Sequence, residues 1–230
     1  MVKKAKSARL FGIFFILSFI SYASGIGLME AGLYPQATPE EVVESKISIA
    51  IGAVSIAFFH TLFNIGLIGI MYIILRSTNH SFAITYLTLG ISSTLMLTIG
   101  AIFLLLPASI AETIMQTGAS DPAFFSGILD LSSRANFYTY QFGMALWGVG
   151  GMVLCYLLNA SKVVPRIFPW LGYVGYAIFI TGCMLELFGL PYGTALSVPG
   201  GLFEITLSIW LIAKGFYHTD SITLGELHMT

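Results

Sequence analysis

The chain has 230 residues, of which 57% are hydrophobic and only 9% are charged. Soluble domains carry roughly 25% charged residues, so this composition excludes an ordinary soluble globular domain. The net charge of -1, without a basic run interleaved with aromatics, argues against nucleic acid as a partner. We therefore expect an integral membrane protein whose main partner is the lipid bilayer.

Six apolar runs are long enough to span a membrane, because a helix needs about 20 residues to cross a hydrocarbon core of roughly 30 Å. They cover residues 10–29, 47–75, 82–107, 136–159, 168–189 and 196–215. Charged residues, Pro, Asn or Ser interrupt the sequence between them. No low-complexity segment or linker divides the chain. The sequence predicts one all-α domain over residues 1–230, an integral membrane bundle of six transmembrane helices.

The first run follows a basic segment, "MVKKAKSAR", and could be mistaken for a signal peptide. Its apolar stretch from Phe11 to Met29 is longer than the 7–15 residues of a signal-peptide core. We therefore expect it to remain as a membrane span. Six spans put both chain termini on the same side.

Lys and Arg predict the orientation, because they gather on the cytoplasmic side of membrane proteins. Lys46 and Arg134 fall on the side opposite the N-terminus. The other basic residues fall on the N-terminal side: Lys3, Lys4, Lys6, Arg9, Arg76, Lys162, Arg166 and Lys214. The bias predicts that both termini are cytoplasmic.

Two segments on the outer side are too long for simple turns. In residues 31–46, Thr38 fits a helix N-cap and Pro39 the first helical position, which predicts a short helix leading into the second span. Residues 109–135 are moderately apolar, and we expect them to lie on or dip into the outer interface. The alternative is that both segments merely cap the bundle.

Glu186 and Glu204 are carboxylates within apolar spans, where ionisable groups usually face protein or a cavity. Small residues at helical spacing accompany both, and such residues mark the faces where membrane helices approach closely. We expect Glu204 to be buried with a partner. Glu186 lies nearer the outer edge, and it is either buried or an interfacial group that reaches water.

The fourth span carries a polar stripe formed by Arg134, Tyr138 and Gln141. Arg134 could bind one of the span carboxylates through its guanidinium. The alternative is a local pair with Asp130, one helical turn earlier. The sequence leaves these two alternatives open.

His60 lies near the middle of the second span, with Asn64 one turn further along. The other histidines, His80, His218 and His228, fall outside the spans, which argues against a haem held by two histidines. No zinc-type histidine spacing is present. We expect no cofactor and no metal. The alternative for His60 is a neutral residue that hydrogen bonds to a neighbouring helix.

Two stretches, "NASKVVPRIFPWLGYVGY" and "PGGLFEITLSIWLIAKGF", carry a family resemblance. Together with "ARLFGIFFIL" and "MYIILRSTN", they resemble a prokaryotic multi-pass membrane family known as domain-of-unknown-function family 4386. The matching positions are Ser161, Pro165, Arg166, Leu171, Gly172, Glu204, Trp210, Lys214 and Gly215. Asn136 and Gly150 stand where that family typically carries histidines. The resemblance implies a multi-pass protein of a prokaryotic plasma membrane and gives no activity.

The leading hypothesis is a polar pocket in the outer half of the bundle that binds a small molecule or lipid headgroup without covalent chemistry. Its candidate residues are Glu204, Arg134, Glu186, His60, Asn64, Tyr138 and Gln141. One alternative is a membrane enzyme acting on a lipid or isoprenoid, with His60 or Glu204 as general acid/base. Another is a proton-coupled transporter, which would need a dimer. Homo-oligomerisation, and a purely structural role in which the polar stripes only join helices, stay open.

Overall fold

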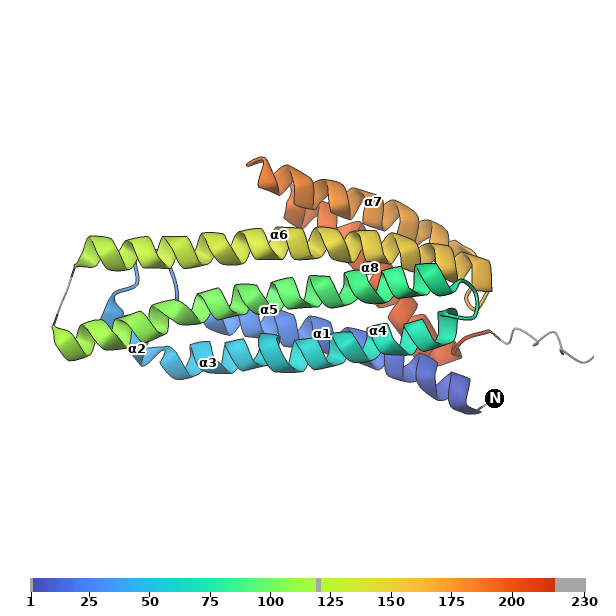
Figure 1. The fold of residues 1–230 in the computed structure, drawn as a ribbon, viewed down its shortest axis with the longest axis horizontal. Helices are drawn as coiled ribbons and strands as arrows, with labels where there is room; N and C mark the ends of the chain where they lie inside the picture. The colour runs from blue at the N-terminus through green and yellow to red at the C-terminus, as the bar shows by residue number, and fades with distance from the viewer. Residues whose placement is uncertain (1, 119–120, 218–230) are drawn as a thin grey trace, which may run out of the picture.

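The computed structural model describes residues 2–118 and 121–217, and its regular elements there are all helical (Figure 1). Six helical runs are long and apolar enough to cross a membrane. They are α1 (Val2–Glu30), a run of α3 (Lys46–Val54), η1 (Ser55–His60) and α4 (Thr61–Leu75), then α5 (His80–Thr117), α6 (Pro122–Ser161), α7 (Ile167–Leu187) and α8 (Gly193–Lys214). A short helix, α2 (Pro39–Glu44), precedes α3. The predicted all-helical architecture with six potential spans is confirmed.

The six runs form a closed ring in which α1 packs against α4 and α8, α5 against α4 and α6, and α7 against α6 and α8. We call the end of the bundle with the N-terminus the terminal end. The opposite end, where α5 turns into α6, is the hairpin end (Figure 1). The ring brings helices that are distant in sequence around one interior.

The interior contains two separate hydrophobic clusters. The cluster nearer the terminal end includes Phe11, Leu75 and Leu158. The cluster nearer the hairpin end includes Met29 and Phe125. Most of the buried polar side chains lie on helix segments between these clusters, so the apolar core is interrupted in the middle of the bundle.

The segment over residues 109–135, which was expected at the outer interface, is helical over most of its described length. Residues 109–117 form the end of α5 (38 residues) and residues 122–135 the start of α6 (40 residues), and each helix is about 60 Å long at 1.5 Å per residue. The third span is predicted to end at residue 107, which is a proline. Here α5 continues through it, and membrane helices tolerate Pro where neighbouring groups satisfy the freed backbone.

The α5–α6 hairpin is much longer than the α7–α8 hairpin (Figure 1). A Cβ atom at Gly148 of α6 would meet Phe179 and Ile180 of α7, which fixes the register of these antiparallel helices. Counting outward from that contact, Leu187 at the end of α7 is level with Gln141 of α6. The part of α6 from Pro122 to Gln141 therefore extends beyond α7 by about 28 Å.

The predicted helix start at Thr38 is confirmed. The Thr38 hydroxyl accepts a hydrogen bond from the Glu41 backbone at 3.3 Å, and the Glu41 carboxylate accepts one from the Thr38 backbone at 2.8 Å. This reciprocal pair is a capping box. Val42 of α2 is fully buried in the cluster near the hairpin end.

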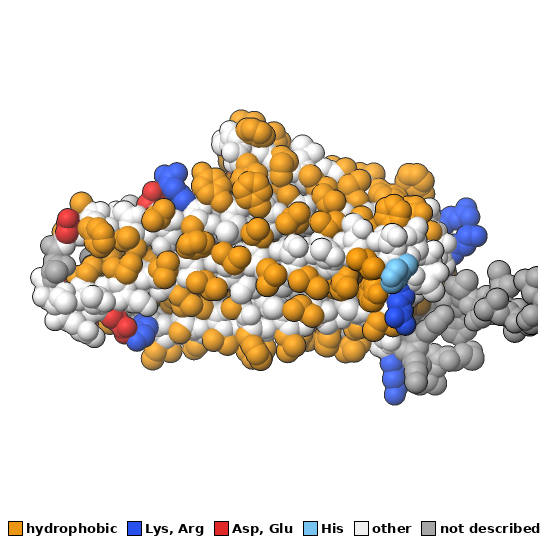
Figure 2. Space-filling view, in the orientation of Figure 1, with side chains coloured by type: hydrophobic (Ala, Val, Ile, Leu, Met, Phe, Trp, Pro, Cys, Tyr) orange, Lys and Arg blue, Asp and Glu red, His pale blue; other side chains and the backbone are white. Residues whose placement is uncertain are grey.

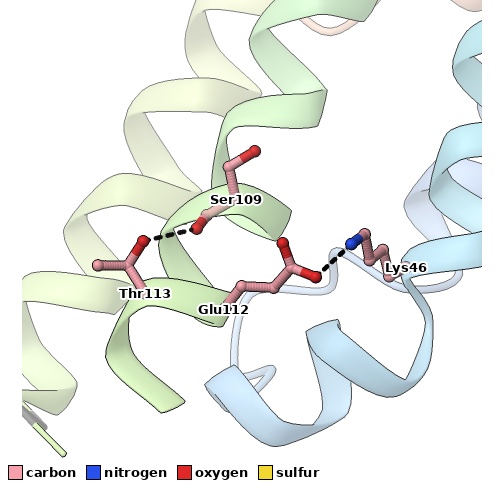
Figure 3. Close-up of polar contacts among 4 residues, drawn as sticks. All are labelled: Lys46, Ser109, Glu112 and Thr113. Carbon is pink, nitrogen blue, oxygen red and sulfur yellow. Dashed lines mark hydrogen bonds and ion pairs between the residues drawn. The ribbon is translucent and has the colours of Figure 1, made fainter. Parts of the chain in front are cut away.

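An ion pair links Lys46, at the start of α3, to Glu112 of α5 (Figure 3). The Thr113 hydroxyl beside it donates to the Ser109 carbonyl in its own helix at 3.1 Å. The Lys46 and Glu112 side chains are 51% and 35% exposed, so the pair contributes little to stability.

Hydrophobic side chains cover the visible face between two zones of charge (Figure 2). Acidic and basic side chains lie together toward the hairpin end, whereas Lys, Arg and His gather at the terminal end (Figure 2). Large apolar side chains on the outside of the spans, such as Ile20, Ile73 and Val174, are more than half exposed. An exposed apolar belt of this kind is what a lipid bilayer covers.

Candidate functional site

A cavity of about 160 Å³ lies between the two hydrophobic clusters. Its wall includes side chains from α1, η1, α4, α5, α6 and α8. The polar residues that line it are Ser18, His60, Asn64, Ser93 and Glu204. Each of these five is at most 6% exposed. The cavity therefore coincides with the polar interruption of the core.

Glu204 lies near the middle of α8 and is held by two hydrogen-bond donors from neighbouring helices. Trp147 Nε1–H of α6 and the Tyr176 hydroxyl of α7 both donate to Glu204 Oε1, each at 2.7 Å. Both donors converge on Oε1, and no hydrogen bond to Oε2 is found among the described residues. Neither of the two ion pairs found among the described residues involves Glu204.

Gly151 of α6 makes room for the Tyr176 ring. A Cβ atom at this position would lie 2.2 Å from Tyr176 Cζ, far inside van der Waals contact. Tyr176 is 1% exposed and packs edge to face against Phe203, with ring centroids 5.6 Å apart. The absence of a side chain at Gly151 thus allows Tyr176 to lie across α6 and reach Glu204.

His60 and Asn64 belong to a continuous hydrogen-bond network. His60 Nδ1 is 3.0 Å from the Ser18 carbonyl oxygen, which can only accept, so Nδ1 carries the proton. Asn64 Nδ2 is 3.1 Å from His60 Nε2 and 3.3 Å from Thr94 Oγ1. Both hydrogens of the Asn64 amide are therefore used, and no hydrogen bond to its Oδ1 is found among the described residues. The network fits a neutral His60 bonded to a neighbouring helix.

A π-helical turn, η1, ends at His60. Such turns insert one extra residue into an α-helix, and they are frequent at functional sites. The Thr61 hydroxyl lies 3.4 Å from the Ile56 carbonyl and 2.9 Å from the Thr98 hydroxyl of α5. These contacts help to hold the wider turn, which sets the direction in which His60 leaves the helix.

Aromatic side chains form much of the remaining wall. They are Phe15, Phe19, Tyr22, Tyr140 and Trp147. Tyr22 and Tyr140 stack with their ring centroids 5.9 Å apart, and Tyr22 also contacts the His60 ring at 5.3 Å. Phe15 is 6.0 Å from the Trp147 ring. The cavity is therefore bounded by both aromatic rings and a carboxylate.

Glu186 lies away from this cavity, in the last turn of α7. Its Oε1 accepts a hydrogen bond from the Gly193 backbone N–H at 2.8 Å. Gly193 begins α8, so Glu186 satisfies a backbone donor that the helix itself leaves without a partner. This carboxylate joins the two helices at their shared turn and does not line the cavity.

The stripe expected on α6 is dispersed. Arg134 Nε binds Asp130 Oδ2 at 2.8 Å, with both side chains more than 60% exposed, so of the two alternatives the structure has the local pair. Tyr138 is 47% exposed and packs against Phe137. Gln141 is 7% exposed, but it is not part of the cavity wall. Of the seven candidates, only Glu204, His60 and Asn64 meet at the cavity.

Several site residues were missed from the sequence. Tyr140, Met144, Trp147 and Gly151 lie at helical spacing on α6, one stripe away from the one chosen. A signal was present, because buried Trp and Tyr need hydrogen-bond partners and a carboxylate within the same membrane can supply one. Glycines beside a Trp also mark a face that approaches another helix closely.

A family model described as a domain of unknown function (DUF4386) matches residues 10–215, which is most of the chain. Neither the curated proteins nor the solved structures contain a match. The match includes every residue of the cavity wall.

Proposed function

The chain belongs to the DUF4386 family, whose description assigns no activity, and we propose that it is a membrane protein that binds a small molecule in the central cavity without covalent chemistry. The observation that carries this proposal is the convergence of Glu204, His60 and Asn64 on one cavity of about 160 Å³. An engineered cavity of about 150 Å³ accommodates benzene, so the space suits a ligand of that order.

The site proposed here is smaller than the one expected from the sequence. It lies at mid-length of the α3–α4 run and of α8, and it omits Arg134, Glu186, Tyr138 and Gln141. Phe19 and Ala23 on the cavity wall are exposed on α1, which gives a lateral approach from lipid. A lipid headgroup therefore remains within the proposal, beside a free small molecule.

The hydrogen bonds of His60 favour ligand binding over acid/base catalysis. Both of its ring nitrogens are engaged, one by the Ser18 carbonyl and the other by Asn64. A general base needs a nitrogen within hydrogen-bond reach of the substrate proton. The enzyme alternative therefore depends on Glu204 alone.

The proposal includes an orientation, with the terminal end in the cytoplasm of a prokaryotic cell and the hairpin end outside its plasma membrane. Its support is the basic bias of the sequence, with eight of the ten Lys and Arg residues on the terminal side.

Native mass spectrometry of the full chain, extracted in mild detergent, tests the binding proposal. The wild-type protein is expected to retain a small molecule or lipid that the Ser93→Phe variant loses, because the larger side chain fills the cavity from α5. Leu95→Phe is the matched control, since Leu95 lies on the same helix and is 51% exposed on the outside. Equal ligand retention by both variants would contradict the proposal, as would a wild-type protein that retains none.

A further inference from the structure

The cavity leaves hydrogen-bond acceptors available and has already used its amide, indole and imidazole donors. Trp147 Nε1–H donates to Glu204, and His60 Nδ1–H donates to the Ser18 carbonyl. Both Asn64 Nδ2 hydrogens go to His60 and Thr94. The atoms left are Asn64 Oδ1 and, with the carboxyl ionised, Glu204 Oε2, and both are acceptors. A ligand that brings hydrogen-bond donors complements these two atoms.

The hydroxyl groups at the cavity do not change this conclusion. Ser18 donates to the Phe15 carbonyl at 2.8 Å. Tyr22, Tyr140 and Ser93 carry hydroxyls that can both donate and accept, so they adapt to whatever the ligand presents. The fixed pattern comes from Glu204 and Asn64.

The charged residues of the cavity wall also favour a ligand that brings hydrogen-bond donors. Glu204 is the only acidic residue of the cavity wall, and no Lys or Arg is among the residues that line it. Burying a carboxylate without a cation is costly. A ligand that carries positive charge supplies the missing counter-charge.

The aromatic wall favours a cation as well. Phe15, Tyr22, Tyr140 and Trp147 surround the space, and cations bind favourably over the faces of such rings. The imidazole of His60 is neutral in its hydrogen-bond network, so it does not repel a cation.

Resting on the proposed function, we infer that the ligand is a protonated primary or secondary amine, whose N–H groups bind Glu204 and Asn64 while its carbon skeleton packs against the aromatic wall. The same chemistry has two sources. One is a free amine, and the other is the ammonium of an aminophospholipid headgroup that enters beside Phe19 and Ala23.

The test compares two probes of nearly equal shape that differ in charge. Isothermal titration calorimetry of the full chain in detergent at neutral pH uses benzylamine, which is protonated, and benzyl alcohol, which is neutral. The ammonium is expected to bind about tenfold more tightly or better, as befits a hydrogen bond to a charged group. This comparison on the wild-type protein does not depend on any variant folding.

Glu204→Gln is expected to abolish the preference for the amine, because Gln keeps an acceptor for Trp147 and Tyr176 but removes the charge. Glu186→Gln is the matched control, a carboxylate on neighbouring α7 that lies outside the cavity wall. It is expected to keep the wild-type preference.

Nanodiscs distinguish the two sources of the amine. If the headgroup is the ligand, benzylamine binds more weakly in phosphatidylethanolamine discs than in phosphatidylglycerol discs, and the difference disappears in Glu204→Gln. If a free amine is the ligand, the lipid makes no difference. Either result supports the inference.

Equal affinity for the two probes, or no binding of benzylamine, overturns the inference. The proposed function is judged separately, by retention of a ligand in the Ser93 and Leu95 variants. If the cavity retains a neutral molecule, the inference that the ligand is an amine is wrong, whereas the proposed binding function still holds.

Discussion

The position of Glu204 depends on a residue that never touches it. Gly151 accommodates the ring of Tyr176, and Tyr176 then donates to Glu204 Oε1. A glycine on α6 and a tyrosine on α7 together orient a carboxylate on α8. A side chain added at Gly151 would therefore displace Tyr176 and, through it, change the position of Glu204 at the cavity.

We expect Gly151→Ala to destabilise the protein by about 1–3 kcal/mol, the usual cost of overpacking, because its Cβ would displace Tyr176. Thermal unfolding in detergent, followed by circular dichroism, measures the change. Gly127→Ala on the same helix is the control, since nothing lies within 4 Å of a Cβ there. A melting temperature of Gly151→Ala equal to that of the control would show that the close contact has no energetic weight.

Glu41 provides a residue-scale test outside the membrane spans. The backbone N–H of Thr38 and the side chain of Tyr34 bind its carboxylate and lower its pKa below 4.5. A lowered folded pKa means that this contact contributes fully above 4.5, the value of the unconstrained group, and is lost as the pH falls through the folded pKa. The short helix α2 is thus expected to lose its capping box only in acid.

Nuclear magnetic resonance of the Thr38 amide can follow this loss. Its signal is expected to move with a midpoint below pH 4.5 in the wild-type protein and to stay in place in Glu41→Gln. A midpoint at or above pH 4.5 would refute the described contact.

At the scale of elements, the π-helical turn η1 is the least regular part of a transmembrane run. One extra residue is accommodated between α3 and α4, which changes the direction of His60 without interrupting the run. The sequence of the turn, "SIAFFH", is mostly apolar, like the rest of the span, and contains no Gly or Pro. Periodicity alone could therefore not indicate the turn, because its position depends on contacts such as Thr61 with Thr98.

Deleting one residue tests the turn directly. Removal of Phe58, which is 60% exposed within η1, is expected to leave a regular α-helix and to keep α4 in register. Removal of Ile65, which is 46% exposed within α4, rotates the residues that follow by about 100° and moves Met71 away from the core. In size-exclusion chromatography in detergent, the protein with the first deletion is expected to give a monodisperse peak. The protein with the second deletion is expected to lose that peak. Similar profiles would argue that η1 carries no extra residue.

At the scale of the whole molecule, composition and run length predicted six helices that are long and apolar enough to span a membrane. Four of the six apolar runs fall within helices of the structure, whereas the runs 168–189 and 196–215 extend two residues and one residue past the ends of α7 and α8. The sequence did not predict that α5 continues to Thr117 and that α6 begins at Pro122, within a segment that was expected at the interface. Pro107 and the polar residues after it resemble a loop, and only packing against neighbouring helices shows that the helix continues.

The site was predicted less completely than the fold. Glu204, His60 and Asn64 stood out because polar groups are rare in apolar spans. Arg134 has the same signal but pairs locally with Asp130. Trp147, Tyr176 and Tyr140 were missed, because Trp and Tyr count as apolar residues in a hydrophobic run. Their hydroxyl and indole groups show a polar role only once the hydrogen-bond partner is known.

The orientation can be measured with accessible cysteines in intact cells. Gln116→Cys near the hairpin tip is expected to react with a membrane-impermeant maleimide, whereas Ser77→Cys at the terminal end is expected to react only after permeabilisation. Both positions are exposed, and the native Cys155 and Cys183 are buried, which limits background labelling. The reverse pattern would overturn the cytoplasmic assignment of the termini.

The α5–α6 hairpin also connects the cavity to the hairpin end of the bundle. Ser93, Leu97, Tyr140 and Met144 of the cavity wall lie on the same two helices that form the tip. From Tyr140 to the start of α6 at Pro122 is about 27 Å, so a tilt of about 5° at the cavity moves the start of α6 by about 2 Å. A pair of spectroscopic probes, one near the start of α6 and one on α7, would therefore report a small tilt of α6 at the cavity as a measurable displacement.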